Sequence, residues 1–79
     1  MTAKELINVD PEIMGGTPVF QGTRVPVQYL FDHLENNATI DEFLAGYPSV
    51  SKNQAIALIH LMSHGIVEGK LLDLNENFA

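Results

Sequence analysis

Three runs of apolar residues with the spacing of amphipathic helices constrain the fold of this chain more than any other feature. In each run the apolar side chains recur at positions i, i+3, i+4 and i+7, which places them on one face of an α-helix. The runs are Val27, Leu30, Phe31 and Leu34; Ile40, Phe43, Leu44 and Tyr47; and Ala55, Leu58, Ile59 and Met62. The sequence therefore predicts three short helices within residues 27–64, each burying one face.

Capping residues mark where two of these helices begin. Thr39 with Glu42, and Ser51 with Gln54, each match the S/T-x-x-E/Q capping box. In this motif the two side chains bond to amides that a helix start leaves unpaired. The second and third helices are therefore expected to start directly after Thr39 and Ser51.

The connections between the predicted helices are short. The polar segment ENNA, residues 35–38, separates the first two helices. Between the second and third, Gly46 can supply a left-handed residue at a helix end, and Pro48 prevents continuation. Three helices joined in this way pack as a small tri-helical unit, and the last two have the spacing of a helix-turn-helix.

The first 26 residues predict an extended arm that contains a short β-hairpin. In the segment VFQGTRV, Gln21 and Gly22 separate two β-prone triplets. Glycine can adopt the positive φ that a two-residue hairpin loop requires. A strand within residues 6–9 is expected to cover the edge of this hairpin.

The register that a two-residue loop implies keeps the hairpin short. It sets Phe20 opposite Thr23, and the next pair would be Pro18 with Val25. Because proline has no amide to donate, the ladder cannot continue past that pair.

The remaining residues, 65–79, form a tail without clear periodicity, and Gly65 and Gly69 are expected to interrupt the third helix. The sequence thus predicts one domain over residues 1–79, with an arm over 1–26, a three-helix body over 27–64 and a tail over 65–79. A chain of 79 residues has a limited core of its own, which favours a dimer or another protein partner.

Composition narrows the compartment and the class of partner. The chain has no cysteine, so disulfides and thiolate metal sites are excluded and nothing argues for an oxidising compartment. It has no apolar run of signal-peptide or membrane-span length, and we expect a soluble cytoplasmic protein. Ten Asp and Glu against four Lys and Arg give a net charge of −6, which repels nucleic acid unless the cations gather on one face.

Patterns associated with catalysis, cofactors or metals are missing or weak. The glycine-rich segment GGTPVFQGTRV lacks the spacing of a phosphate-binding loop or a dinucleotide fingerprint. His60 and His64 lie one helical turn apart, but HLMSH lacks the glutamate of a zinc motif and no third ligand is evident. Acidic pairs such as Asp41 with Glu42 suit a first helical turn or solvent. The sequence favours a protein that is not an enzyme and has no cofactor or metal.

Gly22, Thr23 and Arg24 are the residues of the arm that we single out for a partner contact or a structural role. Arg24 is the only arginine in the chain. A guanidinium beside a tight turn can hold a carboxylate or phosphate with two parallel hydrogen bonds. The alternative is an internal ion pair with one of the ten acids, and this structural role is favoured because acids outnumber cations.

The third helix carries the candidate DNA-binding residues. Lys52 lies at its start, and Asn53 and His60 fall on the face opposite the core. One lysine gives little counterion release, so tight DNA binding by the chain alone is not expected. Ile56 and Leu61 widen the apolar stripe of this helix, which either a protein interface or coverage by the arm or tail explains.

Four short motifs occur along the chain: Asp10-Pro11, Gly16 to Pro18, Gly22 to Val27, and Tyr47-Pro48. They match the pattern Asp-Pro, Gly-x-Pro, Gly-Thr-Arg-[Ile/Val]-Pro-Val and Tyr-Pro, and over about residues 7–64 the chain resembles the bacterial and archaeal family catalogued as domain of unknown function 433. The resemblance implies a homeodomain-like helix-turn-helix fold with an extended N-terminal arm. It also implies a role like that of the antitoxin in a type II toxin-antitoxin pair, with a PIN-like ribonuclease toxin as partner.

Three functions follow as hypotheses. The leading one is a small, dimeric interaction protein that resembles an antitoxin and binds a PIN-like nuclease toxin, with operator DNA as a further target. The first alternative is a stand-alone helix-turn-helix regulator that binds DNA without a toxin. The second alternative is a small ligand-binding protein.

Overall fold

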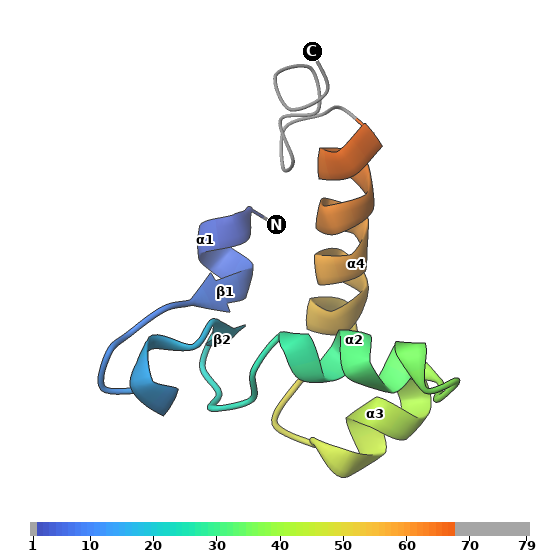
Figure 1. Cartoon of the computed structure of the whole chain (residues 1–79), viewed down its shortest axis with the longest axis horizontal. Coiled ribbons are helices and arrows are strands. Elements are labelled where there is room, and N and C mark those ends of the chain that lie inside the picture. The colour runs from blue at the N-terminus through green and yellow to red at the C-terminus, as the bar shows by residue number, and fades with distance from the viewer. Residues whose placement is uncertain (1, 68–79) are drawn as a thin grey trace.

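Helices occupy the three places that the apolar periodicity predicts (Figure 1). The computed structural model describes residues 2–67 of the chain. Helix α2 spans Gln28–Glu35, α3 spans Ile40–Gly46 and α4 spans Lys52–Val67. Helices α2 and α3 lie across one end of α4, so the three form a tri-helical body. The predicted mainly helical fold is confirmed over the described residues.

Both predicted capping boxes are formed. At the start of α3, the Glu42 carboxylate accepts from the amide of Thr39 at 3.0 Å, and the Thr39 hydroxyl accepts from the amide of Glu42 at 3.1 Å. Gln54 and Ser51 make the same reciprocal pair at the start of α4, at 2.9 and 3.1 Å. These bonds satisfy amides that have no partner inside the helix, which explains why both helices begin where the sequence predicts.

The N-terminal arm contains more regular structure than the sequence predicts. Its elements are helix α1 (Ala3–Leu6), strand β1 (Ile7–Asn8), the 3-10 helix η1 (Met14–Gly16) and strand β2 (Val19–Phe20). A helix of four residues such as α1 is too short to give a periodic signal. Thr2 and Glu5 nevertheless match the capping-box pattern, and the Glu5 carboxylate accepts from the amide and the hydroxyl of Thr2 at 3.0 and 2.9 Å. Helix α1 packs against α4.

Strand β1 covers the edge of the hairpin, as expected for a strand within residues 6–9. It pairs antiparallel with β2, with Ile7 opposite Phe20 and Asn8 opposite Val19. The two strands make a small antiparallel sheet that lies beside α4 (Figure 1).

The predicted hairpin register is wrong by two residues. The Phe20 amide donates to the carbonyl of Val25 at 2.9 Å, so the loop contains residues 21–24 and not Gln21 and Gly22 alone. Thr23 explains the longer loop, because its hydroxyl donates to the Phe20 carbonyl at 2.9 Å and accepts from the Val25 amide at 3.0 Å. The positive φ expected of Gly22 is confirmed, at 78°.

Two glycines do not end helices in the predicted way. Gly46 is the last residue of α3 but its φ is not positive, and the left-handed residue in the body is Asn37, with φ 64°, between α2 and α3. Helix α4 continues through Gly65, because one glycine costs a helix only about 1 kcal/mol relative to alanine. Gly69 and the other residues of 68–79 lie outside the described part of the chain. None of the described helices, α4 with its 16 residues included, has the length and apolar character to cross a membrane.

The hydrophobic core lies where the arm meets the three helices. Its contiguous buried residues are Phe20, Leu30, Phe43, Val50, Ala55 and Leu58. Phe20 of β2 is fully buried, and the centroid of its ring lies 6.1 Å from that of Phe43 in α3. The arm therefore contributes to the same core as the helices.

Helix α4 provides a matched test of this core. Leu58 is 1% exposed and Ile56, half a turn away, is 47% exposed. Leu58→Ala is expected to lower the free energy of unfolding by about 2–5 kcal/mol, because it removes buried methyl groups and leaves a cavity. Ile56→Ala is expected to cost less than about 1 kcal/mol. Urea denaturation followed by circular dichroism measures both, and equal losses would contradict the assigned packing.

Candidate functional site

A cleft of about 420 Å³ opens between β1, the segment that leads into η1, and the hairpin loop. The residues that line it are Asn8, Ile13, Gln21, Gly22, Thr23 and Arg24. The set contains all three residues that the sequence singles out in the arm, together with polar amide side chains and one apolar side chain. Within residues 2–67, no carboxylate lines this cleft.

Hydrogen bonds hold the hairpin loop against two helices, α1 and α4. The Gln21 amide donates to the carbonyl of Leu6 at 2.8 Å, and its side chain donates to the carbonyl of Lys4 at 3.2 Å. The Gln21 carbonyl accepts from the side chain of Gln54 in α4 at 2.9 Å. The loop is therefore bonded to α1 and to α4, and the Thr23 hydroxyl adds two bonds within the hairpin, to Phe20 and Val25. The cleft therefore has a fixed wall.

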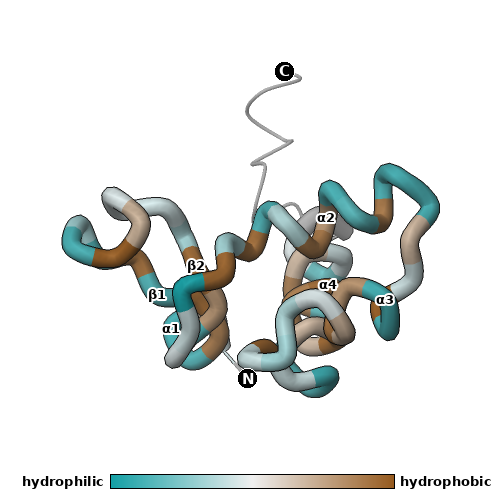
Figure 2. Tube along the Cα trace, turned by 90° about the horizontal axis from the view of Figure 1, so that it is seen from below, coloured by the Kyte–Doolittle hydropathy of each residue, from teal (hydrophilic) through white to brown (hydrophobic). Residues whose placement is uncertain are grey.

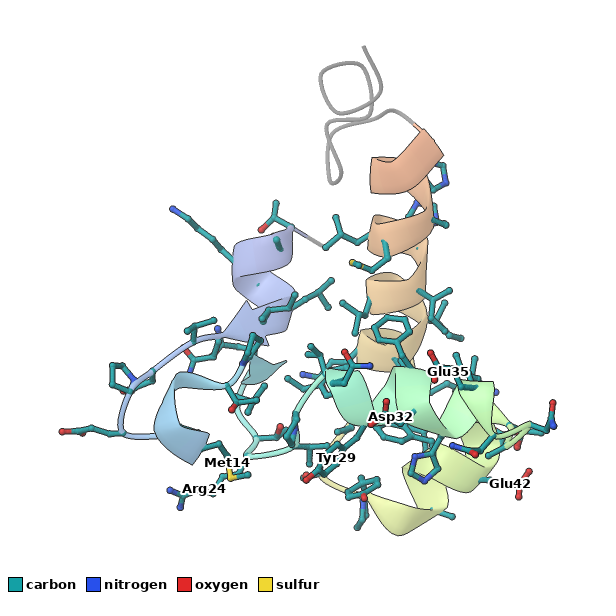
Figure 3. All side chains as sticks on the ribbon, viewed as in Figure 1. Met14, Arg24, Tyr29, Asp32, Glu35 and Glu42 are labelled. Carbon is teal, nitrogen blue, oxygen red and sulfur yellow. The ribbon has the colours of Figure 1, made fainter. Side chains whose placement is uncertain are left out.

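Arg24 is exposed on this loop, and the predicted internal ion pair is not formed within the part of the chain that the structure describes. Among residues 2–67, the ion pair with a nitrogen–oxygen distance below 4.0 Å joins Lys52 to Asp41. In the same residues no hydrogen bond involves the Arg24 side chain. Figure 3 shows the side chains of Arg24 and Met14 at the end of the arm away from α1. The Arg24 guanidinium is thus exposed at the cleft, without an acidic partner among residues 2–67.

The three candidate DNA-binding residues lie on the exposed surface of α4. Lys52, Asn53 and His60 are all exposed. The Lys52 Nζ lies 3.5 Å from an oxygen of Asp41, so an acid partly compensates the one cation of this helix. His60 and His64 stack with ring centroids 4.0 Å apart, and the described residues contain no group of three metal-ligating side chains. The helix thus presents polar groups with little positive charge.

Several apolar side chains are exposed as well. The apolar spacing of the sequence does not predict which ones. Val9 and Met14 of the arm are 61% and 47% exposed. Ile56 of α4 is 47% exposed, whereas Leu61 is half-buried. The sequence leaves two explanations open for Ile56, a protein interface or coverage by the arm or tail. Because the side chain is 47% exposed, the arm does not cover it completely.

The helices α2 and α3 carry an acidic surface. Asp32, Glu35, Asp41 and Glu42 are all exposed, and no lysine or arginine occurs between Arg24 and Lys52. Figure 3 shows Asp32 and Glu35 on α2 and Glu42 on α3. In Figure 2 the trace is hydrophilic along the turn that joins these two helices. We call these four residues the acidic face.

The pKa of Glu5 in α1 is lowered from its ordinary value of 4.5. The main cause is the hydrogen bond from the Thr2 amide, and the second is the bond from the Thr2 hydroxyl. Both bonds favour the charged carboxylate. Glu5 thus stabilises the short helix whose Lys4 carbonyl anchors Gln21.

The tri-helical body with its packed N-terminal arm defines a small, mainly helical domain with a cleft in the arm. Residues 7–60 match the family described as "Protein of unknown function (DUF433)", and the chain belongs to this family. The predicted family resemblance is confirmed.

Two relatives illustrate the match. The chain is 38% identical over 48 residues to "Uncharacterized protein y4eO" from Sinorhizobium fredii (strain NBRC 101917 / NGR234), an alignment that covers 61% of this chain and 22% of that protein. It is similar to the crystal structure of a DUF433 member protein from Anabaena variabilis ATCC 29413, with a TM-score of 0.65 and 26% identity over 82% of this chain and 64% of that one. The chain thus spans about a fifth of the first relative and under two thirds of the second.

Acidification is expected to loosen α1. Because the pKa of Glu5 is lower in the folded chain, its stabilising effect is fully present above its ordinary value of 4.5 and is lost as the pH falls through the folded pKa. The Thr2 amide resonance should report this titration in an NMR pH series. Glu5→Gln keeps an oxygen acceptor but cannot titrate, so the step should disappear. An unchanged step in Glu5→Gln would contradict the assignment.

Proposed function

We propose that this chain is a small protein-interaction domain that resembles the antitoxin of a type II toxin-antitoxin pair. Its partner in this proposal is a PIN-like ribonuclease toxin, its site of action is the cytoplasm, and it works as a dimer. The family resemblance suggests this role, and the surface of the chain supports a protein partner with a basic surface.

The acidic face is the observation that carries the proposal. A ribonuclease needs basic residues to contact the phosphates of its substrate, and an acidic surface of matching shape can cover them. The net charge of −6 adds long-range attraction to such a partner. Exposed apolar side chains elsewhere, such as Ile56 at 47%, offer the desolvated contacts that a stable interface also requires.

Binding to a basic nuclease predicts a specific effect of charge reversal. The test partner is the PIN-like nuclease encoded in the reading frame next to that of this chain. We expect the two proteins to co-purify and the chain to suppress the toxicity of the nuclease. Glu35→Lys is expected to weaken the complex by about tenfold in titration calorimetry, because it replaces attraction by repulsion.

The matched control reverses an exposed acid in the arm. Glu12→Lys changes the net charge by the same amount at a position outside the acidic face. Its affinity is expected to stay within about twofold of the unmodified chain, since a charge outside the interface contributes only long-range attraction, which salt screens. A failure to form any complex contradicts the proposed function, and equal losses for the two variants contradict the role of the acidic face.

A DNA-binding regulator is the second candidate, and the helix-turn-helix arrangement favours it. We propose that α2, α3 and α4 form a homeodomain-like unit with α4 as its recognition helix. The turn between α3 and α4 is compact, because the Val50 amide donates to the Tyr47 carbonyl at 3.0 Å and Val50 is buried. Asn53 and His60 would then face base edges and Lys52 a phosphate.

Gel-shift titration at several salt concentrations separates the two candidates. The acidic charge predicts no binding of the isolated chain to DNA below micromolar concentration. Nanomolar binding with a steep salt dependence would favour the regulator. Loss of such binding in Asn53→Ala would place it on α4.

A further inference from the structure

We propose that the cleft in the arm is a binding site for a carboxylate, with Arg24 as its charged anchor. The site is separate from the acidic face, and the inference does not depend on the antitoxin role. Its ligand is a carboxylate attached to a short apolar group.

The distribution of charge around the cleft points to an anion. The chain carries ten acids and four cations, yet the residues that line the cleft include its only arginine and no acid. The Arg24 guanidinium has no acidic partner within 4.0 Å among residues 2–67. Guanidinium groups bind carboxylates through two parallel hydrogen bonds, and such charged bonds are about twice as strong as neutral ones.

The loop that carries Arg24 is fixed before any ligand binds. Gln21 is bonded to α1 and α4, and the Thr23 hydroxyl donates to the Phe20 carbonyl across the loop. A ligand therefore does not have to order this backbone, which lowers the entropic cost of binding. The amides of Gly22 and Arg24 donate to no acceptor in the described part of the chain. Asn8, Gly22 and Arg24 all line the cleft, so N–H groups of these residues are the further donors that we assign to the site.

The size and the walls of the cleft indicate the rest of the ligand. A volume of about 420 Å³ is within the range of small-molecule sites. Ile13 supplies an apolar wall, and Met14 next to it in the chain is 47% exposed. The cleft has one cation, Arg24, and the chain as a whole has a net charge of −6. One positive charge compensates a monoanion but not a phosphate dianion, which the net negative charge repels more strongly. A carboxylate with a short aliphatic group fits these features.

Such a carboxylate has two sources, a free short-chain organic acid or an acidic side chain flanked by apolar residues in a protein segment. Both present the same planar group to Arg24. Because the cleft is open to solvent, either source has access to it.

The experiment is an NMR titration of the full chain, labelled with nitrogen-15, with sodium butyrate. We expect saturable shifts of the Gly22, Thr23 and Arg24 amides and of the Arg24 side-chain N–H. Butyramide has the same shape without the charge, and its apparent affinity is expected to be at least about tenfold weaker. Shifts that do not saturate, or equal affinities for butyrate and butyramide, would overturn the proposal.

Variants test the anchor. Arg24→Gln is expected to weaken butyrate binding by about tenfold or more, and Arg24→Lys by an intermediate factor because it keeps the charge but loses the two-pronged geometry. Lys52→Gln removes the same charge from α4 and is expected to leave the affinity within about twofold. Since the Arg24 side chain is exposed and makes no bond in the described structure, these variants keep the fold, and the remaining amide resonances verify this. Unchanged binding by Arg24→Gln would overturn the assignment.

Two further titrations identify the source of the carboxylate and test its chemistry. The blocked peptide N-acetyl-Leu-Asp-Leu-amide, compared with its Asn counterpart, represents a protein segment. If the Asp peptide shifts the same resonances with a higher affinity than butyrate, the site is assigned to a protein segment. If butyrate has the higher affinity, the site is assigned to a free acid. Inorganic phosphate binding more tightly than both would contradict a carboxylate site.

Discussion

The burial of Phe20 against Phe43 connects the two halves of this molecule. Phe20 comes from the second strand of the arm and Phe43 from α3, and both side chains are fully buried. Leu6 at the end of α1 and Val19 of β2 are also fully buried, so the arm contributes to the interior along much of its length. A body of three short helices has little interior of its own, and the arm completes it. The position of every other feature of the arm follows from this packing.

The surface follows from the same constraint. With β2 buried, the hairpin loop is held next to α4 by the bond between Gln21 and Gln54, and Arg24 is carried to the exposed end of the arm. Four exposed acids lie on α2 and α3, where Glu42 also caps α3. The molecule thus presents the acidic face on its body and the Arg24 guanidinium at the exposed end of its arm. These two surfaces suit the recognition of different groups.

Local signals in the sequence predict the local structure well. Apolar spacing located α2, α3 and α4, and reciprocal capping at Thr39 and Ser51 set two of their starts, because both depend on residues within one or two turns. The positive φ of Gly22 is another local property. Gly46 at the end of α3 and Gly65 within α4 are weaker predictors of where a helix ends. The conformational freedom of glycine permits a helix end but does not require one.

Features that depend on contacts between distant residues could not be predicted in the same way. The hairpin register has one local cause, the two bonds of the Thr23 hydroxyl, and one distant cause, the burial of Phe20 against Phe43. The partner of Arg24 was predicted from the number of acids, but no acid among residues 2–67 lies within 4.0 Å of its guanidinium. The cleft likewise forms from residues 8 to 24 only after β1 has paired with β2.

Native-state hydrogen exchange of the full chain tests the shared core most directly. If the arm and the body are one cooperative unit, the amides of Phe20 and Gln21 in the arm and of Leu58 in α4 will exchange through the same global opening, with opening free energies within about 1 kcal/mol of one another. Exchange of Phe20 and Gln21 several orders of magnitude faster than that of Leu58 would show that the arm opens alone. That result would contradict the account of the arm as part of the core.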